Sequence, residues 1–137
     1  MKVSFDFDGT LEFQDTQDYA AELVAKGVEV WVVTTRYDEN HKHKYPMNAT
    51  LDDLWEVVDR LGIPRHRVRF TCMEWKYTYL NGTTFAWHLD DNPEEFSKAK
   101  AHGCSVPMVS VDANGWMIKC DRLLESWVAN QQQSKIF

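Results

Sequence analysis

Short apolar runs alternate with amphipathic segments along nearly the whole chain, and this alternation predicts the order of its secondary structure. Runs rich in Val, Phe and Trp are typical of buried strands, whereas apolar positions three and four residues apart are typical of one face of a helix. No repeat or linker interrupts the pattern, which indicates a single domain over residues 1–137. The predicted strands lie at residues 3–7, 28–33, 68–70, 85–89 and 106–111.

Capping residues, prolines and glycines predict where the intervening helices begin and end. The predicted helix starts are Thr16, Thr50 with Asp53 as a variant capping box, Thr71 with Glu74, and Asn92 followed by a proline and two acids. The Asn114-Gly115 pair predicts a tight turn into a short ribbon, and residues 123–128 mark a last helix.

Strands that alternate with helices at this spacing predict a parallel sheet with helices on both faces. We therefore expect an α/β fold, a Rossmann-like three-layer sandwich around a central parallel sheet of five strands. In sheets of this kind ligands bind beyond the carboxyl ends of the strands, so the polar residues there are the candidate site.

Composition narrows the classes of protein that remain. The net charge of −6 argues against broad, sequence-blind binding of nucleic acid, which depends on neutralising phosphates. The odd count of three cysteines fits a reducing compartment better than a disulfide framework. No apolar stretch has membrane-spanning length and the chain opens on a strand pattern rather than a signal peptide, so we expect a cytoplasmic protein without a membrane partner.

Carboxylates, hydroxyls and cations gather where the predicted strands end. Carboxylates that converge at one edge cannot all stay ionised without a cation, and an all-oxygen site of this kind suits Mg²⁺. Such a site leaves positions open for water and for a substrate phosphate. The set consists of Asp6, Asp8, Thr34, Thr35, Arg36, Asp90 and Asp91, together with Lys76 from the segment before the fourth strand. These residues predict a catalytic metal site that binds phosphate.

In this arrangement the chain resembles the haloacid dehalogenase (HAD) superfamily. The stretch "DFDGTL" (6–11) looks like the first motif of that family, and "VWVVTTR" (30–36) is similar to the second, an apolar strand that ends in Thr or Ser. Lys76 stands where the basic residue of the third motif is expected, and "AWHLDDNPEE" (86–95) matches the acidic fourth motif.

The resemblance implies a Mg²⁺-dependent phosphomonoesterase and a role for each matched residue. Asp6 would be the nucleophile that forms an aspartyl-phosphate, and Asp8 would be the general acid and base. Thr34 and Lys76 would bind the phosphoryl oxygens; the choice between Thr34 and Thr35 stays open, and an exposed lysine on a helix is commonplace. The implied metal ligands are Asp6, the backbone carbonyl of Asp8, and the Asp90-Asp91 pair, with Asp91 the preferred direct ligand.

The resemblance also implies an enzyme without a cap domain, because only short segments separate the strands where such domains are inserted. In the family an open site goes with bulky substrates or with closure by a partner subunit, so a homo-oligomer is one expectation. The segment 37–49 follows the second motif, and His41, Lys42, His43 and Lys44 within it could bind a bulky or polyanionic phosphorylated substrate or form a solvated loop.

Several readings stay open from the sequence. A non-catalytic phosphate-binding or scaffold protein on the same fold is the alternative from another class. Within the enzyme reading, a nucleotidase or sugar phosphatase competes with a polynucleotide-end phosphatase. His88 is expected to face a helix rather than the metal, and Trp75 is a candidate to line the site beside Lys76. Trp31, Trp55 and Trp127 are expected in the core.

Overall fold

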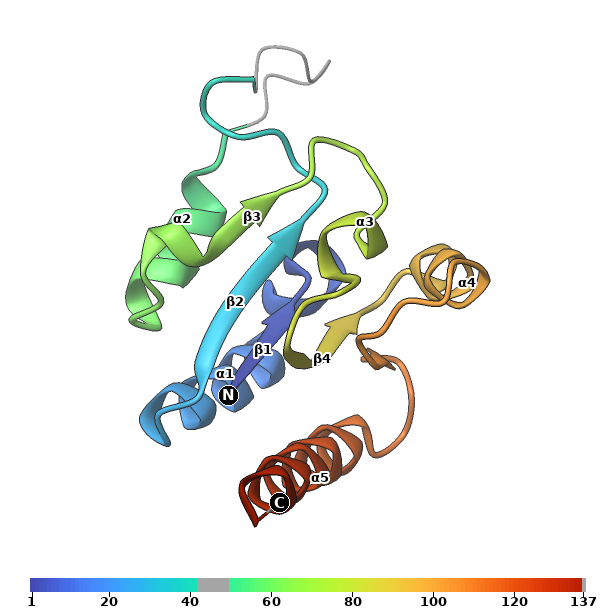
Figure 1. The fold of residues 1–137 in the computed structure, drawn as a ribbon. Helices are drawn as coiled ribbons and strands as arrows, with labels where there is room; N and C mark the ends of the chain where they lie inside the picture. The colour runs from blue at the N-terminus through green and yellow to red at the C-terminus, as the bar shows by residue number, and fades with distance from the viewer. Residues whose placement is uncertain (42–49, 137) are drawn as a thin grey trace.

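A parallel sheet runs through the centre of the computed structural model, which describes residues 1–41 and 50–136 (Figure 1). The described residues form a five-stranded sheet in the order β3-β2-β1-β4-β5, with every neighbouring pair parallel. This arrangement confirms the predicted α/β, Rossmann-like sandwich. The strands are β1 (Lys2–Phe5), β2 (Glu29–Thr34), β3 (Val68–Phe70), β4 (Phe85–Asp90) and β5 (Met108–Ser110).

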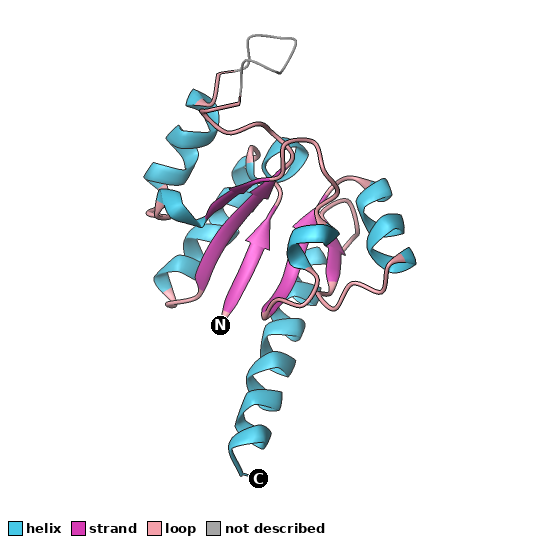
Figure 2. Ribbon diagram, turned by 45° about the horizontal axis from the view of Figure 1, so that its top comes forward, coloured by secondary structure: helices cyan, strands magenta, loops and turns pink. Residues whose placement is uncertain are grey.

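Helices cover both faces of this sheet (Figures 1 and 2). One face packs against α1, α2 and α5, whose apolar side chains join the alternate residues of the strands in the larger core. The other face is covered by α3 and α4, and its core is smaller, with Val33, Leu80, Phe85 and Val106 at its centre. The helices are α1 (Gln14–Ala25), α2 (Asp52–Arg60), α3 (Tyr77–Leu80), α4 (Pro93–Ala101) and α5 (Trp116–Ile136), with short turns at η1 (Phe7–Leu11) and η3 (Arg65–Arg67).

Aromatic rings tie the larger core together. Trp87 on β4 is fully buried, with its ring centroid 5.3 Å from that of Phe5 on β1 in an edge-to-face contact. Tyr19 stacks on Trp87 and donates its hydroxyl to Asp121 on α5, which joins α1 to the last helix. Such pairs add specific geometry to the burial of apolar area, and they fix both helices against the sheet. As predicted, Trp31, Trp55 and Trp127 pack against the two cores.

The predicted start of the first helix is wrong. The helix begins at Gln14, two residues before Thr16, and its flanking residue Phe13 is extended with no side-chain cap. In the first turn of the helix the N–H of Thr16 donates to Asp15 Oδ1 at 2.8 Å, and Thr16 itself is buried. By contrast, Asn92 caps α4 as predicted, because its side chain accepts the backbone N–H of Glu94 at 3.0 Å.

The variant capping box of the second helix does not form. Thr50 Oγ1 accepts the N–H of Asp52 at 3.0 Å, but the carboxylate of Asp53 accepts hydrogen bonds from Arg36 across the loop. An arginine offers a charge-assisted bidentate pair, which is stronger than a return bond to a neutral amide.

The predicted third helix is far shorter than expected. Thr71 donates its hydroxyl to the carbonyl of Glu74 at 2.8 Å, which closes a turn rather than capping a helix. Cys72 and Met73 have positive φ angles of 52° and 70°, a conformation that no helix continues, so α3 begins only at Tyr77.

The Asn114-Gly115 turn leads directly into α5, and the residues between β5 and that helix form turns rather than the predicted ribbon. Within the described residues no helix has an apolar stretch long enough to cross a bilayer.

Candidate active site

A cavity of about 340 Å³ opens at the carboxyl end of the sheet, where the candidate residues were expected. Most of its lining belongs to the predicted set, and Asn92 and Pro93 at the start of α4 complete it. The lining residues are Asp6, Asp8, Thr35, Lys76, Asp90, Asp91, Asn92 and Pro93.

Asp6 follows the central strand β1 and is buried, 5% exposed. Its backbone N–H donates to the carbonyl of Leu89 at 2.8 Å, which extends the pairing of β1 with β4 by one residue and fixes where its side chain leaves the sheet. Burial raises the pKa of the Asp6 carboxyl well above its usual value; Lys76 opposes this and the charge of Asp90 adds to it. The carboxylate therefore needs a cation nearby to stay ionised.

Lys76 supplies one such cation, and it is as buried as the residues it binds. Its Nζ lies 2.7 Å from Asp6 Oδ1 and 2.6 Å from Asp90 Oδ2, while its backbone N–H donates to Glu95 Oε2 at 3.0 Å. Burial alone would lower the pKa of Lys76, but the two carboxylates outweigh it and raise that pKa above its usual value. Lys76 is thus a charged bridge between two acids, and not a solvated helix lysine.

Asp90, at the end of β4, accepts hydrogen bonds from four donors in the described part of the chain. Oδ2 accepts from Lys76 Nζ at 2.6 Å and His88 Nε2 at 2.7 Å, and Oδ1 accepts the N–H groups of Asp91 at 2.9 Å and Asn92 at 3.1 Å. Burial raises the pKa of Asp90, but the bonds from His88 and Lys76 outweigh it and hold that pKa well below its usual range. These four hydrogen bonds hold the Asp90 carboxylate in one orientation at the end of β4.

His88 corrects the expectation that it faces a helix. It is fully buried, and its ring lies between Ser4 Oγ, 2.8 Å from Nδ1, and Asp90 Oδ2. Burial lowers the pKa of His88, which keeps the ring neutral with Nε2–H donating to Asp90 and Nδ1 accepting from Ser4. One signal in the sequence could have indicated the contact with Asp90: His88 and Asp90 are two residues apart and so lie on one strand face. The contact with Ser4 depends on the β1–β4 register, which places Ser4 opposite His88.

Asp91 completes the acidic cluster from the rim of the cavity. Asp6, Asp90 and Asp91 each offer an oxygen within 4.8 Å of the others. Asp91 rests on Gly9 of the η1 turn, where a Cβ atom would overlap its carboxylate. All three acids could contribute to a cation site, and the choice of Asp91 as the direct ligand stays a prediction, favoured by the four hydrogen bonds that Asp90 already accepts.

Asp8 lies on the same rim but faces a different partner. Arg36 Nε donates to Asp8 Oδ2 at 3.0 Å, and Arg36 Nη2 donates to Asp8 Oδ1 at 2.6 Å. Arg36 also donates from Nη1 to Asp53 Oδ1 at 2.7 Å and from Nη2 to Asp53 Oδ2 at 2.8 Å. The guanidinium lies over the ring of Phe7. The bonds from Asp53 and Asp8 raise the pKa of Arg36, and Arg36 in turn lowers the pKa of Asp53. Asp53 is a member of this cluster that sequence reasoning missed, because its role depends on where α2 begins.

The two threonines after β2 occupy different positions. Thr34 is fully buried and its Oγ1 accepts the N–H of Arg36 at 3.2 Å, whereas Thr35 lines the cavity. Trp75 does not line the cavity within the described residues; the Nζ of Lys98 lies 5.4 Å from its ring centroid instead.

The segment after β2 is described only as far as His41. His41 Nδ1 lies 2.7 Å from Asp38 Oδ1 on the surface, so its ring is engaged within its own turn. Lys42, His43 and Lys44 lie outside the described residues, and their predicted contact with substrate stays a prediction.

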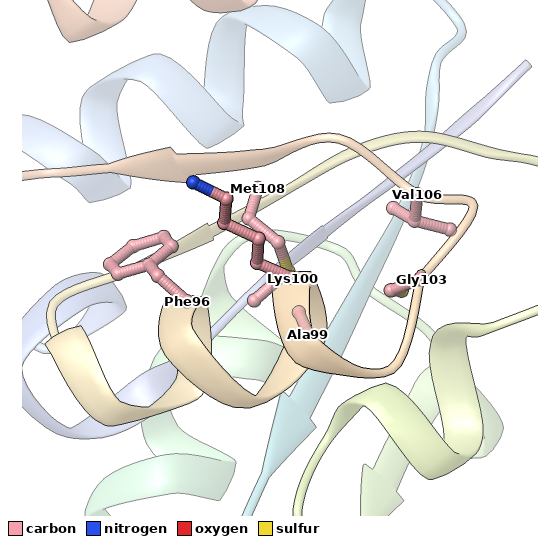
Figure 3. A pocket seen from close by; sticks show the side chains of 7 residues that line it. Phe96, Ala99, Lys100, Gly103, Val106 and Met108 are labelled. Atoms are coloured by element: carbon pink, nitrogen blue, oxygen red, sulfur yellow. The ribbon is translucent and has the colours of Figure 1, made fainter.

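A larger hollow of about 430 Å³ lies between α4 and the edge strand β5 (Figure 3). Its described lining is mostly apolar, with Phe96, Val106 and Met108 on its walls and Lys100 as the one charged side chain. Its described lining contains Cys104 but no acid that could pair with Lys100 or bind a cation, so its size does not make it the candidate active site.

Comparison of the chain with known proteins finds no relative. No protein-family model matches the chain, no curated protein is significantly similar to it, and no solved structure matches it. The functional assignment therefore rests on the geometry of the site.

Proposed function

We propose that this protein is a Mg²⁺-dependent phosphomonoesterase of the kind found in the haloacid dehalogenase superfamily, with Asp6 as the nucleophile. The observation that carries the proposal is the buried Lys76 bridge between Asp6 and Asp90, beside a cavity that Asp91 also lines. A buried acid held in one orientation by a cation, at an opening large enough for a phosphoryl group, is the arrangement that a carboxylate nucleophile needs.

The donor set fits magnesium. Asp6 and Asp91 place carboxylate oxygens within 4.8 Å of one another, and a hard cation with few protein ligands keeps positions for water and substrate oxygens. When bound there, Mg²⁺ would neutralise charge on the phosphoryl oxygens. The charge of the cluster supports this part of the proposal: the positive charge of Lys76 is shared by Asp6 and Asp90, and Asp91 adds a third carboxylate.

Each step of the proposed reaction is assigned to residues of the site. Lys76 holds one oxygen of Asp6, and the other attacks phosphorus as the bond to the leaving oxygen breaks, which forms an aspartyl-phosphate. Asp8 gives a proton to the leaving oxygen and later takes one from the water that hydrolyses the intermediate. Thr35 lines the cavity and is the hydroxyl that could reach a phosphoryl oxygen, whereas Thr34 is fully buried and does not line it.

One observation favours the alternative, a non-catalytic phosphate-binding protein. Both oxygens of Asp8 accept hydrogen bonds from Arg36, so the acid that the reaction requires is engaged elsewhere in this structure. A protein that only binds phosphate would need Lys76 and Thr35 but no free Asp8. The two functions therefore differ in turnover rather than in binding.

Hydrolysis of 4-nitrophenyl phosphate separates them. The proposal predicts release of 4-nitrophenol with Mg²⁺ and its loss with EDTA, and an Asp6→Asn variant should lose activity by orders of magnitude while staying folded. Asp112→Asn, a change at an exposed acid that is not among the described lining residues, is the matched control and should keep full activity. Phosphate binding without turnover by the native protein would favour the alternative.

The finer assignments stay predictions within this proposal. An open cavity fits a bulky or polyanionic substrate, and the choice among a nucleotidase, a sugar phosphatase and a polynucleotide-end phosphatase requires a panel of nucleotides, sugar phosphates and phosphorylated oligonucleotides. Closure of the site by a second subunit and a cytoplasmic location are likewise expectations, to be checked by sedimentation and by fractionation.

A further inference from the structure

The Arg36 guanidinium stands between two carboxylates that come from different parts of the fold. Asp8 belongs to the η1 turn after β1, and Asp53 to the first turn of α2. Arg36 makes paired hydrogen bonds to both, at 2.6 and 3.0 Å to Asp8 and at 2.7 and 2.8 Å to Asp53. Bidentate arginine–carboxylate pairs of this kind are the strongest and most directional of side-chain contacts.

The Asp8–Arg36 pair must separate if Asp8 is to act as the general acid. Asp8 lines the cavity, whereas Arg36 is not among the described lining residues, although its side chain is 20% exposed. Each oxygen of Asp8 accepts a hydrogen bond from the guanidinium, so Arg36 orients this carboxylate, and Asp8 must turn from the guanidinium to protonate a leaving group. Asp53 anchors the other side of the guanidinium, so Arg36 can stay in place when Asp8 departs.

We infer that Arg36 is a specificity residue that releases Asp8 only when an anionic group on the leaving portion of the substrate takes its place on the guanidinium. This inference rests on the proposed phosphomonoesterase function. Once displaced, Asp8 takes a proton from solvent and gives it to the leaving oxygen, so Asp8 and its partner Arg36 are expected on the leaving-group side of the phosphorus. The substrate class is therefore a phosphomonoester whose alcohol carries a second negative charge, such as a carboxylate or another phosphate.

Release of Asp8 by exchange differs from simple binding of the anion. An arginine that merely binds the anion would lower KM for charged substrates and leave neutral ones unaffected. An arginine that withholds Asp8 slows the chemical step for every substrate that cannot displace it. Removal of Arg36 should then raise kcat on a neutral ester, a result that simple binding does not predict.

The test compares 4-carboxyphenyl phosphate with its neutral isostere 4-carbamoylphenyl phosphate, and the corresponding 3-isomers, by release of inorganic phosphate. The native protein should turn over the carboxylates with kcat about tenfold higher or more, the effect expected of one charge-assisted contact. Arg36→Gln should bring that ratio to about one by raising kcat on the neutral esters. Arg36→Lys, which keeps the charge but cannot span two carboxylates, should give an intermediate ratio.

Arg65→Gln is the matched control, because Arg65 also grips an acid, Asp59, through two hydrogen bonds but lies away from the cavity. It should leave the ratio unchanged. Equal turnover of charged and neutral esters by the native protein, or a preference that survives Arg36→Gln, would overturn the inference alone. If no ester were hydrolysed at all, the proposed function would fail, and this inference with it.

Discussion

Gly9 lies so close to the carboxylate of Asp91 that a Cβ atom added to it would overlap that carboxylate. Gly9 also has a φ of +76°, in the left-handed region of backbone conformation that residues other than glycine rarely adopt. The glycine after the two aspartates of the first motif therefore has two separate tasks. It turns the chain sharply after β1, and it leaves room for the acid that arrives from β4.

These two tasks can be separated by substitution. Gly9→Ala should lower the free energy of unfolding by about 1–2 kcal/mol through backbone strain and should also displace Asp91, which removes the stabilisation by Mg²⁺. Gly62→Ala is the control, because Gly62 has a φ of +75° with nothing within 4 Å of an added Cβ. Urea unfolding with EDTA and with Mg²⁺ should show a similar loss for both variants in EDTA. A Gly9→Ala protein that still responded to Mg²⁺ would contradict the role assigned to Asp91.

The two neighbouring acids at the end of β4 should behave differently when removed. Mg²⁺ at saturating concentration should raise the Tm of the native protein by about 5 °C or more. Asp91→Ala should abolish this increase with little change in the Tm of the metal-free protein. Asp90→Ala should lower the metal-free Tm instead, because its four hydrogen-bond donors lose their acceptor in a buried position. Thermal melts in EDTA and in Mg²⁺ test both, and the reverse pattern would exchange the roles of the two residues.

Lys76 should be among the most sensitive positions in the chain. Lys76→Met keeps most of the side-chain volume but leaves Asp6 and Asp90 without their shared cation, which should cost about 3–5 kcal/mol of stability in EDTA. Mg²⁺ should restore part of this loss. Lys98→Met, which removes an exposed cation over Trp75, should cost much less. Equal losses for the two variants in urea unfolding would argue against a charged bridge.

The buried ring of His88 should make the protein sensitive to mild acid. Because burial lowers the pKa of His88 below its usual 6.5, the unfolded chain binds a proton that the folded protein does not. Its contribution to stability is thus fully present above about pH 6.5 and declines as the pH falls below it, by at most about 1.4 kcal/mol per pH unit.

His88→Gln keeps a donor for Asp90 but cannot titrate, so its free energy of unfolding should depend less steeply on pH between 7 and 5.5. Urea unfolding at several pH values gives both slopes. His66→Gln, at an exposed histidine of η3, is the control and should keep the native slope. Identical slopes for the native protein and His88→Gln would show that the ring is not held neutral.

The parts of the fold that could be predicted from the sequence are those that local pattern determines. Runs such as 28–33 have only one stable environment, a strand buried on both faces, and parallel strands that end in acids must place them at one edge. Asp6, Asp8, Lys76, Asp90 and Asp91 accordingly meet at one cavity. Helix starts were less predictable where a tertiary partner competed with a local cap, as Arg36 does for Asp53.

The contacts that the sequence did not reveal all depend on register or on approach between distant elements. His88 meets Ser4 because of the β1–β4 register, which no local pattern determines. The contact of Gly9 with Asp91 and the grip of Arg36 on two acids arise in the same way, from loops that meet only after the sheet has formed. Residue type indicated the chemistry of the site, whereas the pairing of its members required the tertiary structure.

The central place of β1 in the strand order has a consequence for when the site can exist. Ser4 and His88, whose side chains are hydrogen-bonded next to Asp90, are 84 positions apart in the chain. The amide of Asp6 donates a hydrogen bond to the carbonyl of Leu89, where β1 and β4 meet. During synthesis β1 therefore lacks its neighbour β4 until most of the chain has been made. Once the two strands have joined, no local opening can free that amide, so its hydrogen should exchange with solvent as slowly as the whole protein unfolds.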